Sequence, residues 1–115
     1  MTDTHCHITF PQYDADRAEV LARAAKARVR AIVNPGTDLT QSRAAVALAS
    51  GRADSIPTVF AGVGVHPQDV GTLTEDDFRA LTELARDARV VAIGEVGLER
   101  SPRSPTLDVQ REWLT

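Results

Sequence analysis

The sequence predicts an α/β fold in which parallel strands alternate with helices. Four apolar segments are expected to form the strands, and segments with helical periodicity separate them. The last three apolar segments, centred on Ile32, Gly62 and Ile93, lie about 30 residues apart, which is the length of a strand, a crossover helix and two short loops. This repeat indicates four βα units whose strands all run in the same direction.

The four predicted strands share an apolar character. They cover residues 4–10, 30–34, 58–66 and 89–98. Because side chains alternate between the two faces of a strand, the imidazoles of His5 and His7 should point the same way. Cys6, between them, should point to the opposite layer.

The predicted helices carry start and stop signals of their own. Asp16 with Glu19 is typical of a helix start and predicts a first helix over residues 16–27, and Thr74 with Asp77 predicts the start of the third. Gly51 is expected to end the second helix as a left-handed cap. The apolar stripes of the second and third helices are Ser42, Ala45, Val46 and Ala49, and Phe78, Leu81, Ala85 and Ala88.

A fourth helix is expected to begin near Leu107, and the sequence stops shortly after Trp113, so we expect a chain that is cut within this helix. A closed TIM-type (β/α)8 barrel needs about 200 residues or more, so four βα units correspond to half of one. A parallel (β/α) half-barrel is therefore one of two folds that this repeat allows.

A flavodoxin-like doubly wound sheet is the structural alternative, because it also suits a chain of this length. Strand order separates the two folds. A half-barrel has its strands in the order 1-2-3-4, whereas the doubly wound sheet places strand 2 outside strand 1.

Composition limits the classes of function. The 115 residues carry a net charge of −3 and are 43% hydrophobic, as in a soluble globular domain. No apolar run approaches the roughly 20 residues that span a bilayer, and the N-terminus lacks a secretory signal, so we expect a cytoplasmic protein without a membrane partner. Mild acidity excludes a broad nucleic-acid-coating surface but is compatible with an enzyme that meets phosphates through metal ions at one point.

His5 and His7 are the first chemical signal. Two nitrogen donors on one face of a strand make half of a metal site. An isolated pair of histidines at this spacing is equally consistent with ordinary surface or packed side chains.

Glu95, in the apolar segment 91–98, is the second signal. A carboxylate in a strand that is apolar on both faces costs several kcal/mol to desolvate unless a cation or a donor meets it. An ion pair with an arginine such as Arg100 would meet this need. A metal ion shared with His5 and His7 would satisfy all three groups at once, because imidazole and carboxylate are a common ligand set.

His66 and Asp38 follow other predicted strands. His66 comes immediately before Pro67, at the expected rim of the same face, where it could bind a substrate phosphate, act as an acid or base, or cap the strand. Asp38 is as consistent with a helix N-cap as with a functional carboxylate.

Four ordered blocks of the chain resemble the TatD-type metal-dependent deoxyribonucleases. The blocks are Asp-Thr-His-Cys-His at 3–7, Pro-Gly-Thr-Asp at 35–38, Gly-Val-Gly-Val-His-Pro at 62–67 and Ala-Ile-Gly-Glu-Val-Gly-Leu at 92–98. The resemblance favours the half-barrel and implies that residues 1–115 are the N-terminal portion of a single amidohydrolase-type (β/α) barrel domain, which in its complete form hydrolyses phosphodiester bonds in DNA with two divalent ions per complete site. It also implies that His5 and His7 bind a metal, that Glu95 binds or bridges the metals, and that His66 lies near the substrate phosphate.

The chain departs from the family pattern in two ways. Glu99 stands where the family usually has an aspartate. The further metal-binding histidines and the general-base aspartate of the family belong to strands beyond Thr115, so no catalytic base is assigned within residues 1–115. We therefore expect the chain alone to bind metal weakly and to be inactive, and its exposed sheet edges to favour self-association.

The predicted function is metal-dependent hydrolysis of DNA by the complete chain, with Mg, Mn or Zn as the ion. Two other functions stay open. The first is an amidohydrolase-type hydrolase of a small amide, ester or phosphoester, because fold and metal site do not fix the substrate. The second is a non-catalytic truncated relative.

Overall fold

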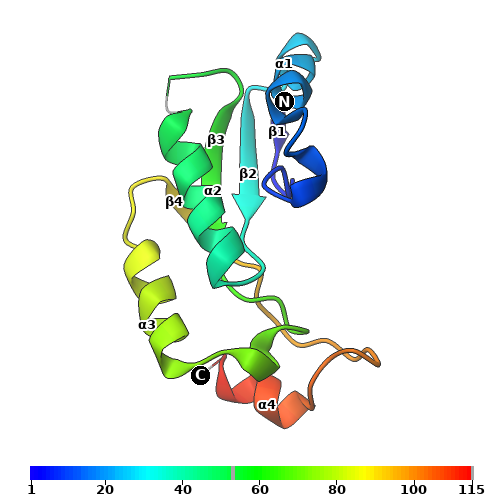
Figure 1. The fold of residues 1–115 in the computed structure, drawn as a ribbon, viewed down its shortest axis with the longest axis vertical. Coiled ribbons are helices and arrows are strands. Elements are labelled where there is room, and N and C mark those ends of the chain that lie inside the picture. Colours follow the sequence, from blue (N-terminus) through cyan, green and yellow to red (C-terminus); the bar gives the residue numbers. More distant parts are fainter. Residues whose placement is uncertain (53, 115) are drawn as a thin grey trace.

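The computed structural model describes residues 1–52 and 54–114 and contains one parallel sheet in the order β1-β2-β3-β4 (Figure 1). The strands are β1 (Thr2–Asp3), β2 (Ala31–Pro35), β3 (Thr58–Val63) and β4 (Val90–Ile93). Every neighbouring pair is parallel. This order confirms the predicted half-barrel and excludes the flavodoxin-like sheet.

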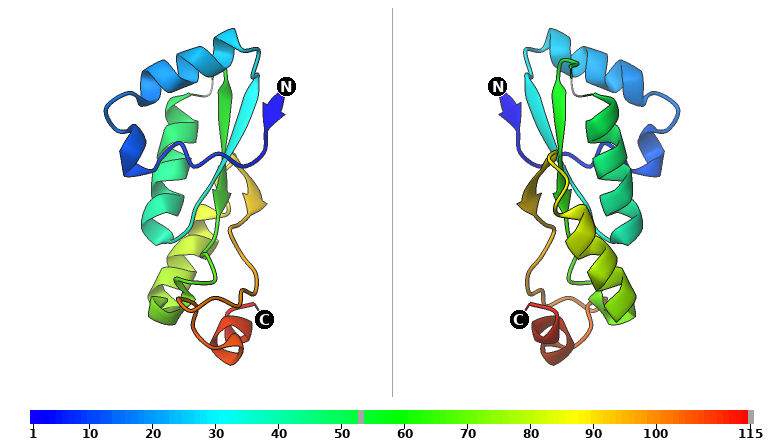
Figure 2. Two further views of the ribbon diagram at one scale, coloured as in Figure 1. Left: turned by 90° about the vertical axis from the view of Figure 1, so that its right-hand side faces the viewer. Right: turned by 90° about the vertical axis from the view of Figure 1, so that its left-hand side faces the viewer.

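Helices alternate with the strands along the chain. They are α1 (Arg17–Lys26), α2 (Leu39–Gly51), α3 (Glu75–Leu84) and α4 (Leu107–Glu112), with two short 3-10 turns, η1 (Pro11–Tyr13) and η2 (Val70–Thr72). Figure 2 shows α1, α2 and α3 on one side of the sheet, and no described helix covers the other side. The uncovered side corresponds to the inside of a barrel. Helix α4 lies beyond the carboxyl ends of the strands (Figure 1).

The structure confirms some of the predicted helix starts and ends and contradicts others. Thr74 and Asp77 form the predicted capping box of α3. Asp38 is the N-cap of α2, where its carboxylate accepts a hydrogen bond of 2.6 Å from the amide of Gln41. The prediction for Gly51 was wrong, because this residue is the last residue of α2 and lacks a positive φ. Asp16 precedes α1 but makes no side-chain capping bond.

Two of the four strands, β3 and β4, are shorter than predicted, and the prediction of a strand over residues 4–10 was wrong, because none of these residues lies in a strand. Strand β1 ends at Asp3, whose carboxylate accepts a hydrogen bond of 3.0 Å from the amide of His5. Such a local side-chain bond competes with strand pairing, and the chain turns from there on. Strand β3 ends before His66, and β4 ends before Glu95. The chemically important residues therefore lie in the loops after the strands.

The hydrophobic core lies between the sheet and the helices that cover it. Its buried side chains include Leu21, Ile32, Ala45, Val59, Ala61, Val63 and Leu81. Other large apolar side chains are at least half exposed on β4 and the segment after it, namely Val91, Ile93, Val96 and Leu98. The exposure of these residues is consistent with an open sheet edge, and self-association stays a prediction. None of the described helices is long and apolar enough to cross a membrane.

Candidate metal centre

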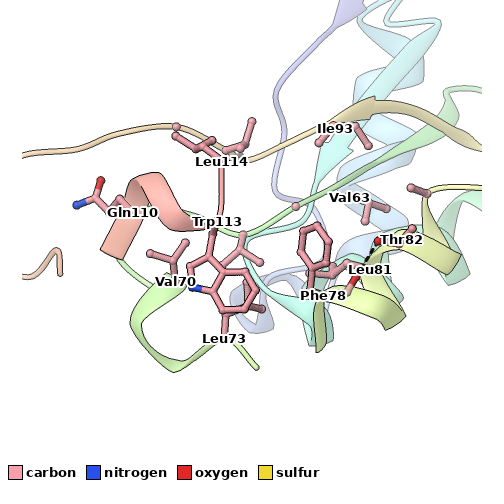
Figure 3. A pocket seen from close by; sticks show the side chains of 15 residues that line it. Val63, Val70, Leu73, Phe78, Leu81, Thr82, Ile93, Gln110, Trp113 and Leu114 are labelled. Atoms are coloured by element: carbon pink, nitrogen blue, oxygen red, sulfur yellow. Dashed lines mark hydrogen bonds between the residues drawn. The ribbon is translucent and has the colours of Figure 1, made fainter. Parts of the chain in front are cut away.

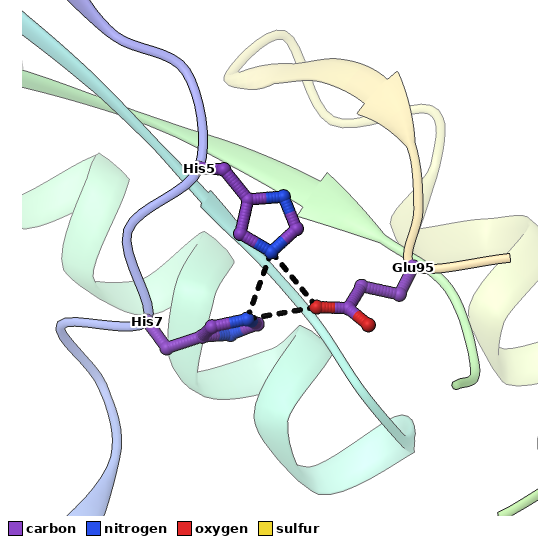
Figure 4. A group of neighbouring side chains, drawn as sticks. All are labelled: His5, His7 and Glu95. Atoms are coloured by element: carbon purple, nitrogen blue, oxygen red, sulfur yellow. Dashed lines mark hydrogen bonds and ion pairs between the residues drawn. The ribbon is translucent and has the colours of Figure 1, made fainter. Parts of the chain in front are cut away.

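Three side chains that are far apart in the sequence meet at the carboxyl ends of the strands. His5 and His7 lie in the loop after β1, and Glu95 follows β4 (Figure 4). The Glu95 Oε1 atom is 2.9 Å from His5 Nε2 and 2.8 Å from His7 Nε2, and the two Nε2 atoms are 3.0 Å apart. These atoms form the one group of potential metal ligands found among the described residues.

The loop that carries His5 and His7 is attached to β2. The amide of Cys6 donates a hydrogen bond of 3.1 Å to the carbonyl of Val33, and Ile8 is buried in the core. Asn34, fully buried at the end of β2, accepts a hydrogen bond of 3.1 Å from the amide of Thr9 and donates one of 3.0 Å to the Thr9 hydroxyl. Both imidazoles thus converge from an anchored turn rather than from the predicted strand.

Replacing Asn34 with alanine is expected to lower the free energy of unfolding by about 1–3 kcal/mol, because the amide of Thr9 loses its acceptor and the Thr9 hydroxyl keeps only its bond to Gln41. Chemical denaturation monitored by circular dichroism would measure the loss. Gln12→Ala removes an exposed amide and serves as the control, with an expected change below about 0.5 kcal/mol. Equal stability of the two variants would contradict the anchoring role of Asn34.

Cys6 is not part of this group of ligands. Its side chain is half-buried and packs against the core. Burial, followed by the negative charge of Asp3, raises the pKa of the Cys6 thiol above its ordinary value. Because the thiolate is the form that binds metal, the protonated thiol is a poor ligand at neutral pH.

The short loop after β2 holds the segments that carry Glu95 and His66. The carbonyl of Gly36 accepts a hydrogen bond of 2.7 Å from the amide of Glu95. The next carbonyl, of Thr37, accepts one of 2.8 Å from the amide of His66. Two adjacent carbonyl groups thus bring the loops after β3 and β4 to the same place.

Close backbone contacts at this junction require glycine. A Cβ atom on Gly64 would lie 2.3 Å from the carbonyl oxygen of Glu95 and 2.7 Å from the carbonyl carbon of Gly94. The buried hydroxyl of Ser42, on α2, is 3.2 Å from both the amide and the carbonyl of Gly64 and bonds to each. The glycines of the sequence block at 62–67 therefore allow the backbone after β3 to approach the backbone that carries Glu95.

His66 faces the same carboxylate from the other side. Its Nε2 atom is 3.3 Å from Glu95 Oε2, and its Nδ1 atom accepts a hydrogen bond of 3.2 Å from the amide of Gln68. Among the described residues, the ion-pair partners of Glu95 are thus histidines and not Arg100, the alternative that the sequence left open. Glu95 also lies past the end of β4, and its side chain is 19% exposed, so the expectation of a mid-strand carboxylate was wrong.

The donor set suits a divalent ion. An octahedral ion with bonds of about 2.1 Å has neighbouring ligands about 3.0 Å apart, and a tetrahedral ion with similar bonds has them about 3.4 Å apart. The observed triangle of 2.8, 2.9 and 3.0 Å is closer to the octahedral face. His7 Nδ1 is buried and has no hydrogen-bond partner within the described part of the chain, while its ring stacks on Phe10 with centroids 4.5 Å apart. The stacked ring directs Nε2 toward Glu95.

Sequence reasoning missed a polar network next to this site. Glu99 was noted only as a departure from the family pattern, and Gln68 and Gln110 were not singled out. All three interact through hydrogen bonds in the structure. Gln110 is 1% exposed. The one signal in the sequence for this network was a polar residue on the apolar side of the last helix.

An apolar cavity of about 280 Å³ lies between β4, α3 and α4 (Figure 3). Its lining includes Phe78, Leu81, Ile93, Trp113 and Leu114, and none of His5, His7 and Glu95 contributes to it. This cavity is therefore separate from the candidate metal centre.

Comparisons with known sequences relate the chain to metal-dependent hydrolases. The profile of the family described as "TatD related DNase" matches residues 2–115. The uncharacterized metal-dependent hydrolase YabD of Bacillus subtilis is 36% identical over 110 residues, which cover 96% of this chain and 42% of YabD. The 3'-5' ssDNA/RNA exonuclease TatD of Cronobacter sakazakii is 40% identical over 99 residues, which cover 86% of this chain and 36% of that protein.

Solved structures share the fold. The crystal structure of YJJV, a TatD homologue from Escherichia coli, matches with a TM-score of 0.83 and 33% identity, covering 99% of this chain and 43% of YJJV. A TatD family hydrolase from Entamoeba histolytica matches with a TM-score of 0.85 and 23% identity, covering 97% of this chain and 42% of that protein. The chain thus spans less than half the length of each of these relatives.

Proposed function

The chain belongs to the family of TatD-related DNases, and on this basis we propose that it supplies His5, His7 and Glu95 as metal ligands to an enzyme that hydrolyses phosphodiester bonds in DNA. The observation that carries this proposal is the convergence of two imidazoles and one carboxylate from the two ends of the chain. Nothing in the core requires two histidines and a glutamate to meet at the end of a sheet. A shared cation explains why they do.

Each site residue has a separate role in this proposal. His5, His7 and Glu95 would hold an ion, since the two Nε2 atoms and Glu95 Oε1 meet at one point, while Glu95 Oε2 faces His66. His66, at the rim, binds a non-bridging oxygen of the substrate phosphate. Bound divalent ions would supply Lewis acidity and an activated water.

The residues described here form one side of such a centre. A two-metal hydrolytic centre needs further ligands opposite these three, and a base to position the water. We therefore assign hydrolysis to a longer protein that contains this chain and has the full length of the relatives. We expect residues 1–115 alone to bind metal weakly and to be inactive. The site's general-base aspartate is expected outside these residues.

The decisive experiment is a hydrolysis assay of such a full-length protein with Mg²⁺ or Mn²⁺. Single-stranded DNA with a free 3' end is the first substrate to test, because a relative of this chain is named for acting on it. RNA, an amide and a small carboxyl ester are the comparison substrates. We expect metal-dependent release of nucleotides, and we expect chelation with EDTA to abolish it.

The same assay separates the alternatives. Hydrolysis of the amide or the ester, with the nucleic acids intact, would replace the nuclease proposal with a small-molecule hydrolase. Loss of all metal-dependent hydrolysis would overturn both and leave a non-catalytic relative. Tight stoichiometric binding of Mn²⁺ to residues 1–115 alone would contradict the proposal that this half of the site is incomplete.

A further inference from the structure

Glu99 lies in the loop after β4, outside the group of metal ligands, and one oxygen of its carboxylate accepts two hydrogen bonds. Its Oε2 atom accepts hydrogen bonds of 2.9 Å from Gln68 Nε2 and of 2.6 Å from the Ser104 hydroxyl. The Ser104 bond, followed by the Gln68 bond, lowers the pKa of Glu99 below its ordinary value. Glu99 is therefore a charged acceptor at neutral pH, and bonds to a charged acceptor are stronger than those between neutral groups.

The backbone of Glu99 is fixed from α4. The amide of Glu99 donates a hydrogen bond of 2.7 Å to Gln110 Oε1, and Gln110 Nε2 donates one of 2.9 Å to the carbonyl of Glu99. Gln110 Nε2 also donates a bond of 2.7 Å to the carbonyl of Pro105. Because Gln110 is 1% exposed, these bonds form away from water and hold the loop firmly.

Gln68 connects Glu99 to the candidate site. Its side-chain amide is held by Glu99, and its backbone amide donates to His66 Nδ1 at 3.2 Å. A neutral imidazole carries its single proton on one nitrogen, so a ring that accepts at Nδ1 carries the proton on Nε2. The protonated Nε2 atom of His66 is the one that faces Glu95 Oε2, at 3.3 Å.

We propose that Glu99 is a positioning residue that acts through Gln68 to hold His66 in the Nε2–H tautomer, with its donor aimed at the site. In this arrangement His66 donates a hydrogen bond to a phosphate oxygen and does not bind a metal through Nε2. The inference deepens the proposed function and rests on it for the phosphate. The tautomer itself depends only on the residues of this chain.

The test is an NMR measurement of the histidine ring nitrogens in ¹⁵N-labelled protein without metal, at alkaline pH. In the wild-type protein we expect the Nε2–H tautomer at His66. Glu99→Ala should convert this ring to a mixture of both tautomers, whereas Glu99→Gln keeps an acceptor for Gln68 and should retain the wild-type signal. Glu83→Ala, which removes an exposed glutamate of α3, is the matched control and should also leave the signal unchanged.

Gln68→Ala is the second variant in case Glu99→Ala fails to fold. It removes the side-chain amide through which Glu99 holds residue 68, and it leaves the bonds between Glu99 and Gln110 intact. It should give the same mixture of tautomers. A His66 ring that keeps the Nε2–H form in Gln68→Ala, or in folded Glu99→Ala, would overturn the inference. A His66 ring that carries its proton on Nδ1 in the wild-type protein would overturn the inference as well.

Kinetics of the full-length protein give a second readout. Glu99→Ala should raise KM for the nucleic-acid substrate about 10-fold, and Glu99→Gln should raise it less than about 3-fold. If the wild-type protein does not hydrolyse nucleic acid, the proposed function fails, and the tautomer measurement still decides the positioning role. Hydrolysis by the wild-type protein, together with an unchanged His66 tautomer in Glu99→Ala or Gln68→Ala, would overturn only the positioning role.

Discussion

Replacing Glu95 with glutamine in a protein of the full length of the relatives is expected to lower its affinity for Mn²⁺ by roughly 100-fold or more, and to remove its hydrolysis. Glutamine has nearly the same shape, so packing is preserved, but it lacks the negative charge that faces three imidazoles. Without that charge, two neutral nitrogen donors remain to hold a divalent ion. Isothermal titration calorimetry with Mn²⁺ would measure the affinity.

The control for this experiment is Asp76→Asn. Asp76 lies on α3 with a side chain that is 90% exposed, and its ion-pair partner is Arg79 on the same helix. The substitution removes the same charge from the chain at a distance from the site, so the affinity should change less than about 2-fold. An equal affinity of Glu95→Gln and the wild-type protein would remove the basis for the metal centre.

Replacing Gly64 with alanine is expected to lower the free energy of unfolding by roughly 3 kcal/mol or more. The added Cβ atom would lie 2.3 Å from the carbonyl oxygen of Glu95. Backbone atoms cannot rotate away as a flexible side chain would, so β3 and the segment after β4 must separate. We expect the Mn²⁺ affinity to fall with the stability, because the same movement displaces Glu95. Thermal and urea unfolding would measure the first effect, and calorimetry the second.

Gly51→Ala is the matched control for the same chemical change. A Cβ atom on Gly51, at the end of α2, would have no neighbour within 4 Å among the residues that the structure describes. Alanine is preferred over glycine in a helix, so this variant should be more stable by roughly 0.5–1 kcal/mol. If Gly64→Ala were as stable as the wild-type protein, the close contact between the two loops would be disproved.

The parallel βα repeat was predictable because it depends on spacing: apolar segments about 30 residues apart leave room for one crossover helix each. Spacing alone left the strand order open between a half-barrel and a flavodoxin-like sheet, because both contain this repeat, and the family resemblance favoured the half-barrel. Strand ends were harder to predict. The apolar residues around Glu95 read as one long strand, although β4 ends at Ile93. Which apolar residues pair depends on backbone contacts between loops, and the sequence does not display them.

The meeting of His5 and His7 with Glu95 was predictable from chemistry, although the reason given for it was only half right. The alternation of a strand was expected to point both imidazoles the same way, whereas a turn anchored by Asn34 does so. The link from Glu99 to His66 was beyond the reach of sequence reasoning. It depends on how α4 packs Gln110 against the loop after β4, and no local pattern encodes such a contact.

The two carbonyl groups of Gly36 and Thr37, which accept from the amides of Glu95 and His66, have a consequence for mutagenesis. Every residue type has a main-chain carbonyl, so scanning the side chains of this loop would leave these bonds in place and would classify Thr37 as unimportant. Inserting or deleting one residue there would shift both acceptors at once and separate the carboxylate from the imidazoles. Changes in loop length are therefore far more harmful at this position than changes of residue.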